Sequence, residues 1–466
     1  MINNLSRRLR FEIYFLTMKT HAWLLRGLPT RKIYYQLKKS EFATKEEIQK
    51  SHGDLLHEII NHHYSSTPHF KKVMTERGLT PEDFTCLQDL SKLPLLEKSE
   101  ISSNLQNGLI STIIPQRHLH KISTSGSTGK PFTIFADREQ LEFRFAATLR
   151  AMEMTGWRFG DRQARLWHQK IGMSQSQVIR ERIDAWFHRR IFIPAFEMDQ
   201  KSLGDFIKRI EKHRPVLIDG YAESLNFIAT YLKGNNAPAI EPKAVISSAQ
   251  MLPEATKVII EDALKTRVYD KYGSREFSGI AWQCEIGEGH HVVEESYIVE
   301  LITEGRPSKP GELGEVVITD LRNKAMPMFR YRIGDLAMEV EDPWTCKCGR
   351  NSRRIGRIEG RTQSIVRCTN GRWLPGSLFL HYFKDYETVM EQFQIHQNNP
   401  DGFELRVIKG LLFTEKQFEL VIEGLREFIG DTPIDVSFVD EIPLVRTGKR
   451  SPIVSTLEYD FQNLAS

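Results

Sequence analysis

The sequence predicts an α/β protein, with a large layered N-terminal α/β domain and a small α+β C-terminal domain. A chain of 466 residues that is 40% hydrophobic can bury a large core and exceeds the usual size of one domain. Its middle part alternates short apolar runs with helix-like stretches, as α/β domains do. The last hundred residues read as a separate strand, helix and strand. We therefore place domains at 1–359 and 360–466, with the boundary in the Gly- and Arg-rich run 356–361.

Buried strands are expected at 245–246 and 268–269, where apolar residues are short and continuous. The stretch 253–266 between them reads as a helix. A further strand is expected at 314–320, because it follows the turn-rich segment 307–311. This order indicates a layered α/β body.

In the C-terminal segment we expect a strand at 404–408, a helix at 415–429 and a strand at 434–438. Apolar residues repeat on one face of the helix, which we interpret as core. The helix is bounded by a capping box of Thr414 and Gln417, a hydrophobic staple of Phe413 and Phe418, and Gly430 at its end.

Charge and hydropathy exclude several classes of protein. Lys and Arg number 64 against 60 Asp and Glu, and a net charge of +4 is not that of a nucleic-acid-binding domain. The apolar run near the start is too short and too interrupted for a secretory signal. No stretch has the roughly 20 apolar residues that span a bilayer. We expect a soluble cytoplasmic protein.

The segment 7–39 mixes Arg and Lys with aromatic residues and leucine. Such a segment could lie on the inner face of an anionic membrane as a peripheral contact. The other interpretation, which we favour, is an amphipathic helix packed on its own domain.

The sharpest chemical signal is a loop at 123–131 that combines hydroxyls, glycines and a lysine. Glycines let backbone N–H groups approach phosphate oxygens, hydroxyls add donors, and the ammonium offsets the charge. The spacing is not that of a nucleoside-triphosphatase P-loop, which has four residues between its glycines and Ser or Thr after Lys. We predict that ATP phosphates are bound by Ser123, Thr124, Ser125, Gly126, Ser127, Thr128, Gly129 and Lys130.

This loop resembles the phosphate-binding signature of adenylate-forming enzymes, and three further segments of that superfamily follow in order. They are the Tyr-Gly-x-x-Glu segment at 272–276, the ribose-binding segment at 331–335 and the catalytic-lysine segment at 447–449. The Leu-Pro pair at 93–94, the Met-Pro pair at 326–327 and the Cys-x-Cys-Gly-Arg run at 346–350 are similar to the phenylacetate–CoA ligase-like branch. That branch includes CapK-type proteins associated with capsular polysaccharide loci.

The resemblance implies a role for each matching residue. Glu276 would hold a magnesium ion, for which a carboxylate oxygen is a suitable ligand. Asp335 would accept hydrogen bonds from the ribose diol, with Arg361 near the ribose. The positions that would contact the adenine and the ribose are Tyr272, Gly273, Ser248, Ala249 and Gln250.

Lys449 corresponds to the catalytic lysine of the family. A mobile cation is suited to a step in which a carboxylate attacks the α-phosphorus and pyrophosphate leaves. The resemblance implies that the small domain closes for adenylation and rotates for thioester formation. The sequence departs from the family at the hinge, where Gln363 stands in place of the usual Asp or Lys, and this puts the rotation in doubt.

Five cysteines at uneven spacing do not form a disulfide framework in a chain of this length. Cys284, Cys346 and Cys348 with one histidine would complete a tetrahedral structural zinc site. The Gly-x-His pattern favours His291 over His290 as the fourth ligand. Plain buried thiols are the alternative.

Tyr221 occupies a place that resembles the acyl pocket, and a core tyrosine is an equal alternative. The predicted activity is ATP- and Mg²⁺-dependent formation of an acyl-AMP from a small carboxylic acid, with coenzyme A as acceptor. Transfer to an amine, hydroxyl or carrier in surface-polysaccharide synthesis is a second hypothesis. A non-catalytic nucleotide-binding scaffold is a third, disfavoured because Lys449, Glu276 and Asp335 are all present.

Overall fold

The computed structural model describes residues 2–16, 30–124, 132–167, 175–195, 200–235, 240–249, 252–303, 305–359, 365–370, 373–442 and 452–455. The chain divides into two compact units. Unit 1 contains Met1–Ser123, Thr133–Gly160 and Tyr269–Arg361, and unit 2 contains Thr124–Phe132, Asp161–Val268 and Thr362–Ser466. The break after Arg361 lies beside the predicted domain boundary, but the segment 161–268 groups with the C-terminal residues. The domain limits 1–359 and 360–466 stay a prediction.

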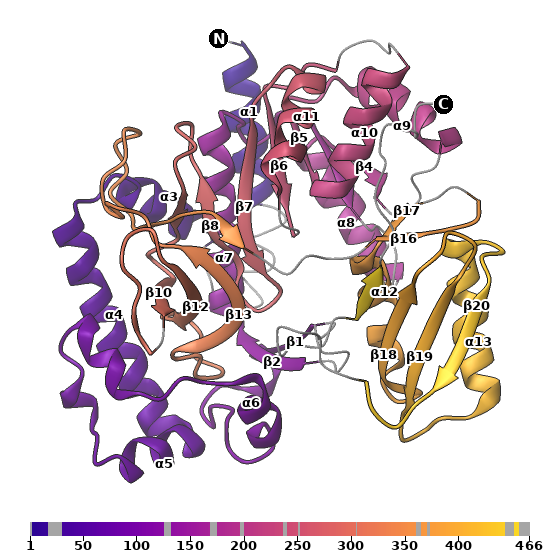
Figure 1. The fold of residues 1–466 in the computed structure, drawn as a ribbon. Helices are drawn as coiled ribbons and strands as arrows, with labels where there is room; N and C mark the ends of the chain where they lie inside the picture. The colour runs from indigo at the N-terminus through magenta and orange to yellow at the C-terminus, as the bar shows by residue number, and fades with distance from the viewer. Residues whose placement is uncertain are drawn as a thin grey trace. The chain divides into compact units, whose positions relative to one another are not determined.

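Six helices and two antiparallel sheet regions make up most of the described part of unit 1 (Figure 1). The helices are α1 (Ile2–Tyr14), α3 (Thr30–Ser40), α4 (Lys45–Ser66), α5 (Pro68–Glu76), α6 (Lys98–Asn104) and α7 (Arg138–Met152). Short 3₁₀ turns occur at η2 (Pro81–Asp83), η3 (Leu87–Lys92), η4 (Gln116–His118) and η5 (Glu153–Thr155).

One sheet of unit 1 has the order β11-β10-β12-β13-β15. Its strands are β10 (Tyr297–Thr303), β11 (Arg306–Pro307), β12 (Leu313–Asp320), β13 (Tyr331–Met338) and β15 (Ile358–Glu359). A second run of strands has the order β14-β9-β8-β7, formed by β7 (Val268–Ser274), β8 (Ser278–Gln283), β9 (His290–Val292) and β14 (Arg354–Ile355). β1 (Leu119–Thr124) and β2 (Phe132–Asp137) pair separately.

Unit 2 contains parallel strands in the order β6-β5-β3-β4. They are β3 (Gln163–Trp167), β4 (Arg190–Pro194), β5 (Leu217–Tyr221) and β6 (Ala244–Ser248), connected through α8 (Gln175–Phe187), α9 (Gln200–His213), α10 (Ala222–Gly234) and α11 (Glu254–Leu264). Every residue of β5 and β6 is buried, as expected for parallel strands covered by helices.

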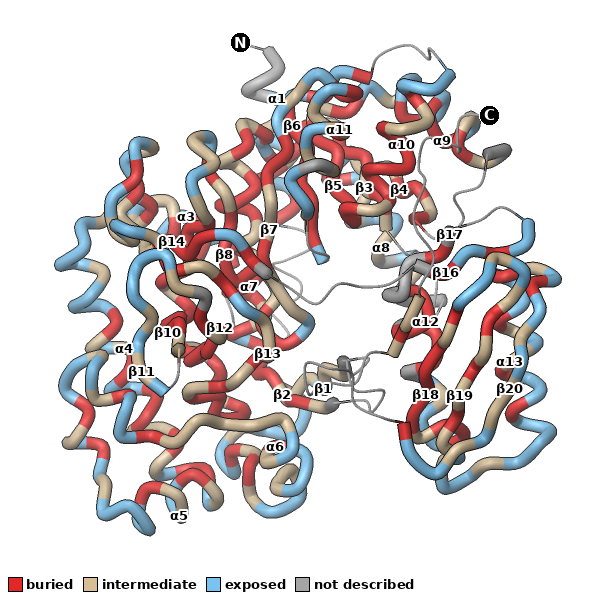
Figure 2. The backbone as a smooth tube through the Cα atoms, in the orientation of Figure 1, coloured by how far each residue is buried: buried red, intermediate tan, exposed pale blue. Residues whose placement is uncertain are grey.

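The C-terminal part of unit 2 has a four-stranded sheet in the order β20-β19-β18-β21. Its elements are β16 (Ile365–Arg367), β17 (Trp373–Pro375), α12 (Gly376–Phe383), η6 (Lys384–Tyr386), β18 (Met390–Gln397), β19 (Phe403–Lys409), α13 (Glu415–Ile429), β20 (Ile434–Phe438) and β21 (Ile453–Ser455). Figure 2 shows β18 as mostly buried, while α13 alternates buried and exposed positions. Phe418, Val421 and Leu425 form the buried face of α13.

The predicted α/β class is confirmed, and the elements expected from sequence occur close to their predicted limits. The helix expected at 415–429 and the strand expected at 434–438 have those bounds. Thr414 Oγ1 accepts a hydrogen bond from the Gln417 amide at 3.2 Å, and the rings of Phe413 and Phe418 are 5.8 Å apart. The return bond of the expected capping box is absent among the described contacts, because Thr414 Oγ1 also donates to the Gln417 side chain. Among the described helices, none is long and apolar enough to cross a membrane.

A close backbone approach in the β7–β8 hairpin requires glycine at 273. A Cβ atom on Gly273 would lie 2.0 Å from the Ser278 carbonyl oxygen, so the two strands could not keep their pairing. We expect Gly273→Ala to destabilise the protein by roughly 1–3 kcal/mol, the usual range for overpacking. The melting temperature should fall by about 2–12 °C in differential scanning fluorimetry.

Gly53→Ala is the matched control, because a Cβ there meets nothing closer than the Thr85 carbonyl oxygen at 3.9 Å. Gly53 lies inside α4, where alanine is favoured by roughly 0.5–1 kcal/mol, so this variant should keep or raise the melting temperature. An unchanged melting temperature in Gly273→Ala would contradict the packing argument.

Candidate active site and metal centre

β1 and β2 flank the predicted phosphate-binding loop. Ser123 lies on β1 shortly before the loop, and its hydroxyl lies 3.4 Å from the Thr133 hydroxyl on β2. The backbone of Thr124 belongs to β1. Ser125, Gly126, Ser127, Thr128, Gly129 and Lys130 lie outside the described residues, as do Gln250, Arg361, Gln363 and Lys449. The predicted roles of these residues stay predictions.

Glu276 lies in the tight turn between β7 and β8. Ser278 adopts a positive φ of 63°, and the ladder shifts by one residue between Tyr272 and Gly273, which forms a β-bulge. The Glu276 side chain is buried, yet its two contacts are long. The Tyr331 hydroxyl and the Lys98 ammonium approach Oε1 to 3.4 and 3.8 Å. Both contacts reach one oxygen, so Oε2 has no hydrogen-bond partner among the described residues and is available to a cation.

Asp335 lies in a second bulge, on β13. The ladder pairs Glu315 with Leu336 and Val317 with Arg332, so three residues of β13 stand opposite one residue of β12. Gly334 has a φ of +85°, a conformation that glycine adopts without steric strain. Bulges of this kind redirect side chains out of the regular alternation. The segment expected to bind ribose is therefore displaced from the ladder.

Tyr272 and Asp335 come together across these two interrupted ladders. The Tyr272 hydroxyl donates a hydrogen bond to Asp335 Oδ2 at 3.0 Å. Tyr272 is buried, whereas Asp335 is half-buried. A carboxylate held in this way can accept hydrogen bonds from a diol.

Lys98 is a site residue that the sequence analysis missed. Leu96 joins β13 through hydrogen bonds from its amide to the Arg330 carbonyl at 2.9 Å and from the Arg332 amide to its own carbonyl at 3.0 Å. Glu97 then pairs with Arg332 at 2.5 Å, and Lys98 follows at the start of α6. The sequence did contain a clue to Lys98, because the Leu-Pro pair at 93–94 that marks the resemblance ends only four residues before it.

The predicted adenine segment follows β6 in unit 2. Ser248 is the last residue of this buried parallel strand, and Ala249 has an unusual positive φ of 68°. The hydroxyls of Ser247 and Ser248 are buried, and neither has a hydrogen-bond partner in the described part of the chain. Ligands of open α/β sheets bind at the carboxyl ends of parallel strands. Unmatched hydroxyls at that position fit a polar ligand.

Tyr221 is fully buried in unit 2. Its ring stacks on Trp167 at 4.4 Å with an interplanar angle of 11°, and Arg165 lies 4.6 Å from the Trp167 ring. The tyrosine belongs to the hydrophobic core around Phe379 and Leu405. This placement corresponds to the core alternative, and a role in the acyl pocket stays a prediction.

The four predicted metal ligands lie together in unit 1. One donor atom from each of Cys284, His291, Cys346 and Cys348 lies within 4.8 Å of the others. The sulfurs of Cys284 and Cys346 are 3.8 Å apart, and Cys348 Sγ is 3.4 Å from His291 Nε2. Thiolates bound to one tetrahedral zinc at about 2.3 Å would be separated by about 3.8 Å. The donor set and its spacing therefore fit zinc.

The surroundings of this cluster distinguish the two histidines. His291 Nδ1 lies 2.9 Å from the Ser352 hydroxyl, which leaves Nε2 directed at the sulfurs. His290 instead contacts Asp270 at 3.0 Å and the Gly356 carbonyl at 3.1 Å. Ser352 is a second residue that the sequence analysis missed, because its separation from His291 gives no signal.

Burial by itself raises the pKa of the Cys348 thiol, but its contact with His291 and the Arg350 amide lowers that pKa to about 6. Burial lowers the pKa of His291, and the thiols of Cys284 and Cys348 more than reverse this and bring it to about 9. The pKa of the Cys284 thiol is also lowered, despite its burial, by His291 and nearby backbone amides, whereas burial and the neighbouring thiols raise the pKa of Cys346 to about 12. Negative charge is therefore stabilised on Cys284 and Cys348, and a cation would be needed to stabilise it on Cys346.

Comparisons with known proteins identify relatives of the chain. No protein-family model matches the chain. It is 26% identical over 441 residues to the phenylacetate–coenzyme A ligase of Pseudomonas putida, covering 91% of this chain and 97% of that protein. It is 22% identical over 409 residues to protein CapK of Staphylococcus aureus, covering 86% and 88%.

Among solved structures, 2-hydroxyisobutyryl-CoA ligase in complex with 2-HIB-AMP and CoA in the thioesterification state has a TM-score of 0.61. The match covers 90% of this chain and 91% of that one, at 18% sequence identity. The postadenylation state of the same ligase has a TM-score of 0.59. The chain is therefore a homologue of the phenylacetate–CoA ligases and CapK, with the fold of adenylate-forming CoA ligases.

Proposed function

We propose that the protein is a ligase that activates a carboxylic acid with ATP as its acyl-AMP and then transfers the acyl group to coenzyme A. The observation that carries this proposal is the meeting of Tyr272 with Asp335 beside the buried turn that holds Glu276. Homology to phenylacetate–CoA ligases over most of the chain supports the same reaction.

In this proposal Asp335 accepts hydrogen bonds from the ribose hydroxyls, and Tyr272 fixes the orientation of its carboxylate. Arg361 assists at the ribose, Ser248, Ala249, Gln250 and Gly273 surround the base, and Tyr221 borders the acyl group. Residues 123–130 bind the phosphates. Glu276 would hold magnesium, which fits a buried carboxylate with one uncommitted oxygen. When bound, the ion would neutralise charge on the phosphates.

Lys449 would stabilise the charge that develops as the carboxylate attacks the α-phosphorus and pyrophosphate departs. If it acts only in that transition state, Lys449→Ala should slow acyl-AMP formation by roughly 10²–10³-fold. ATP affinity should change little, because the other nucleotide contacts remain. Pyrophosphate release from a panel of carboxylic acids, with and without coenzyme A, measures the overall reaction.

Lys208→Ala is the matched control, because Lys208 is an exposed lysine elsewhere in unit 2. Release of ADP and orthophosphate by the wild type would rule out adenylation. Equal rates in wild type and Lys449→Ala would remove Lys449 from the site. Acyl transfer from chemically supplied acyl-AMP should survive the substitution, and product analysis with an amine or hydroxyl acceptor tests the alternative in surface-polysaccharide synthesis.

We also propose that Cys284, His291, Cys346 and Cys348 bind one structural zinc ion. Four protein ligands close the coordination shell, so the metal would join the β8–β9 connection to the 346–348 loop and take no part in the reaction. Metal analysis of protein purified without added metal should give about one zinc per chain. A Cys346→Ser/Cys348→Ser variant should lose it and melt at a lower temperature.

Two matched histidine variants sharpen the zinc test. His291→Gln should lose the metal, whereas His290→Gln should keep it, because His290 is engaged by Asp270 and the Gly356 carbonyl. Cys86→Ser, at an exposed cysteine, should also keep it. A folded wild type that contains no metal would refute the proposal.

We also propose that the protein is cytoplasmic and that α1 makes a peripheral contact with the inner membrane face. The inner side of the helix packs on unit 1, since Phe11 and Tyr14 are buried against Phe159. Its outer side exposes Leu9 by 59%, and Leu16, two residues after the end of the helix, is 64% exposed. Exposed apolar residues at helical spacing beside arginines are typical of helices at an anionic membrane surface.

We expect the protein to co-sediment with phosphatidylglycerol vesicles at low salt and less with phosphatidylcholine vesicles. Leu9→Glu/Leu16→Glu should abolish this binding, because a carboxylate would enter the lipid interface. Val258→Glu, at a residue of α11 that is 55% exposed, is the control and should bind as the wild type does. Wild type that stays in the supernatant with both vesicles would contradict the contact.

A further inference from the structure

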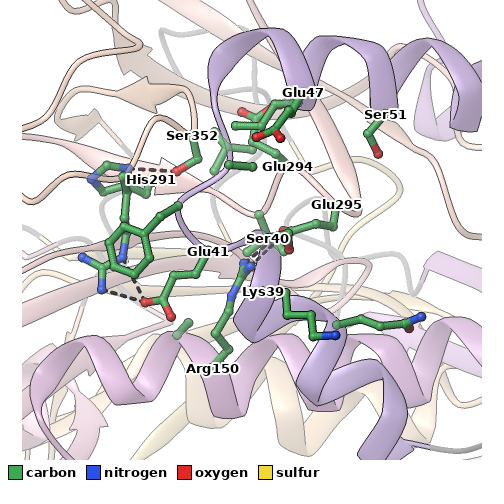
Figure 3. A pocket seen from close by; sticks show the side chains of 18 of the residues that line it. Lys39, Ser40, Glu41, Glu47, Ser51, Arg150, His291, Glu294, Glu295 and Ser352 are labelled. Atoms are coloured by element: carbon green, nitrogen blue, oxygen red, sulfur yellow. Dashed lines mark hydrogen bonds and ion pairs between the residues drawn. The ribbon is translucent and has the colours of Figure 1, made fainter.

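Unit 1 contains a cavity of about 480 Å³ at the N-terminal helices, separate from the turn that holds Glu276. Its walls come from α3, α4, the end of α7 and the segment around β9 (Figure 3). This volume falls in the range of small-molecule sites. Much of the wall is apolar, with Phe42, Ile48, Met154 and Val293 among the lining residues.

The carboxylates of the wall are already engaged. Glu294 Oε2 lies 3.0 Å from His52 Nε2, and Glu295 accepts a hydrogen bond from Arg150 Nη2 at 3.0 Å. Figure 3 shows Arg150 reaching from α7 towards Glu295 and Ser40. These groups therefore satisfy one another and do not require a ligand.

Two N–H groups of the same wall are left unmatched. His52 and Arg150 are only 2% and 5% exposed, yet His52 Nδ1 and Arg150 Nε have no hydrogen-bond partner among the residues that the structure describes. His52 Nε2 donates to the Glu294 carbonyl at 2.7 Å. Burial lowers the pKa of His52, but the bonds to Glu294 outweigh it and raise the pKa above its ordinary value. Protonated His52 presents Nδ1–H as a second donor.

The buried atoms of the wall that have no partner are all nitrogen atoms. Trp282 Nε1 is the third buried lining atom without a partner, and it packs close to Gly279. Arg150 Nε and Trp282 Nε1 are N–H donors, and His52 Nδ1 is a donor when the ring is protonated. In the described part of the chain, these three are the buried side-chain nitrogen and oxygen atoms of the wall without a partner. A group that only accepts hydrogen bonds is the natural complement of this set.

The balance of charged side chains around the cavity favours a ligand with a low net charge. Four carboxylates, Glu41, Glu47, Glu294 and Glu295, stand against three cationic side chains, Lys39, Arg150 and Arg350, and two histidines, His52 and His291. A polyphosphate would bring several negative charges towards these carboxylates without a matching excess of cations. A single carboxylate with an apolar body suits both the donors and the apolar wall.

We propose that this cavity is an accessory binding site for a small monocarboxylate with an apolar body, whose oxygens accept hydrogen bonds from His52 and Arg150. The site lies wholly within unit 1 and does not depend on the proposed reaction. Ser51 on α4 and Gln36 on α3 are exposed residues of its rim, so a large side chain at either position would obstruct it without removing a buried charge.

The probes are 4-fluorobenzoate and 6-fluorohexanoate, each paired with the alcohol of the same skeleton, and binding is followed by ¹⁹F NMR relaxation. At least one carboxylate should bind the wild type at least about tenfold more tightly than its alcohol. Ser51→Trp and Gln36→Trp should each weaken that binding at least about tenfold. Ser65→Trp, at an exposed serine of the same helix, should leave it unchanged.

Circular dichroism and melting temperature establish that each variant is folded, and either blocking variant is sufficient if the other is unfolded. Carboxylate binding that survives the blocking substitution would place the probe elsewhere, including the acid-activating site, and overturn the proposal. Equal affinity for carboxylate and alcohol, or no binding below about 10 mM, would also overturn it, since water would then satisfy the donors.

Discussion

The site in unit 1 depends on the interruption of two antiparallel ladders. A regular strand sends alternate side chains to opposite faces, so Tyr272, Glu276 and Asp335 could not be combined by uninterrupted pairing. The bulge in β7–β8 and the larger bulge in β13 remove this restriction, and the hydrogen bond from Tyr272 to Asp335 joins them. Glycine is needed at both places, at Gly273 for the close strand approach and at Gly334 for its positive φ.

Buried ion pairs connect the N-terminal helices to the strands that carry the metal ligands. Arg350 donates to Glu41 at 2.7 Å and to Glu285 at 3.1 Å, and it follows the second cysteine of the 346–348 loop by two residues. Arg150 pairs in the same region with Glu295. Removing one partner of such a pair leaves a buried charge without a counter-ion. This loss destabilises the protein more than the intact pair stabilises it. The metal cluster and the cavity therefore share a polar wall in which most groups are mutually satisfied.

The proposed metal site and the proposed nucleotide site are held in place by different kinds of interaction. The four metal ligands come from two segments far apart in sequence, and their thiol and imidazole donors can be held by one ion at a fixed spacing. The nucleotide residues are positioned by backbone geometry, which exists before any ligand binds. Loss of a bound metal should accordingly act on stability, whereas changes at Asp335 should weaken nucleotide binding and changes at Lys449 should slow turnover.

Local sequence determined the helix at 415–429, because its cap, staple and apolar face are all encoded within a few residues. The sequence also identified Glu276, Asp335 and the four predicted metal ligands, because their side chains suit the chemistry expected of them. The Gly-x-His pattern also favoured His291 over His290, and the structure agrees. Only the tertiary structure decided that Lys98 approaches Glu276 and that His52 and Arg150 line one cavity. Those contacts join residues tens to hundreds of positions apart, and neither periodicity nor spacing specifies which side chains then meet.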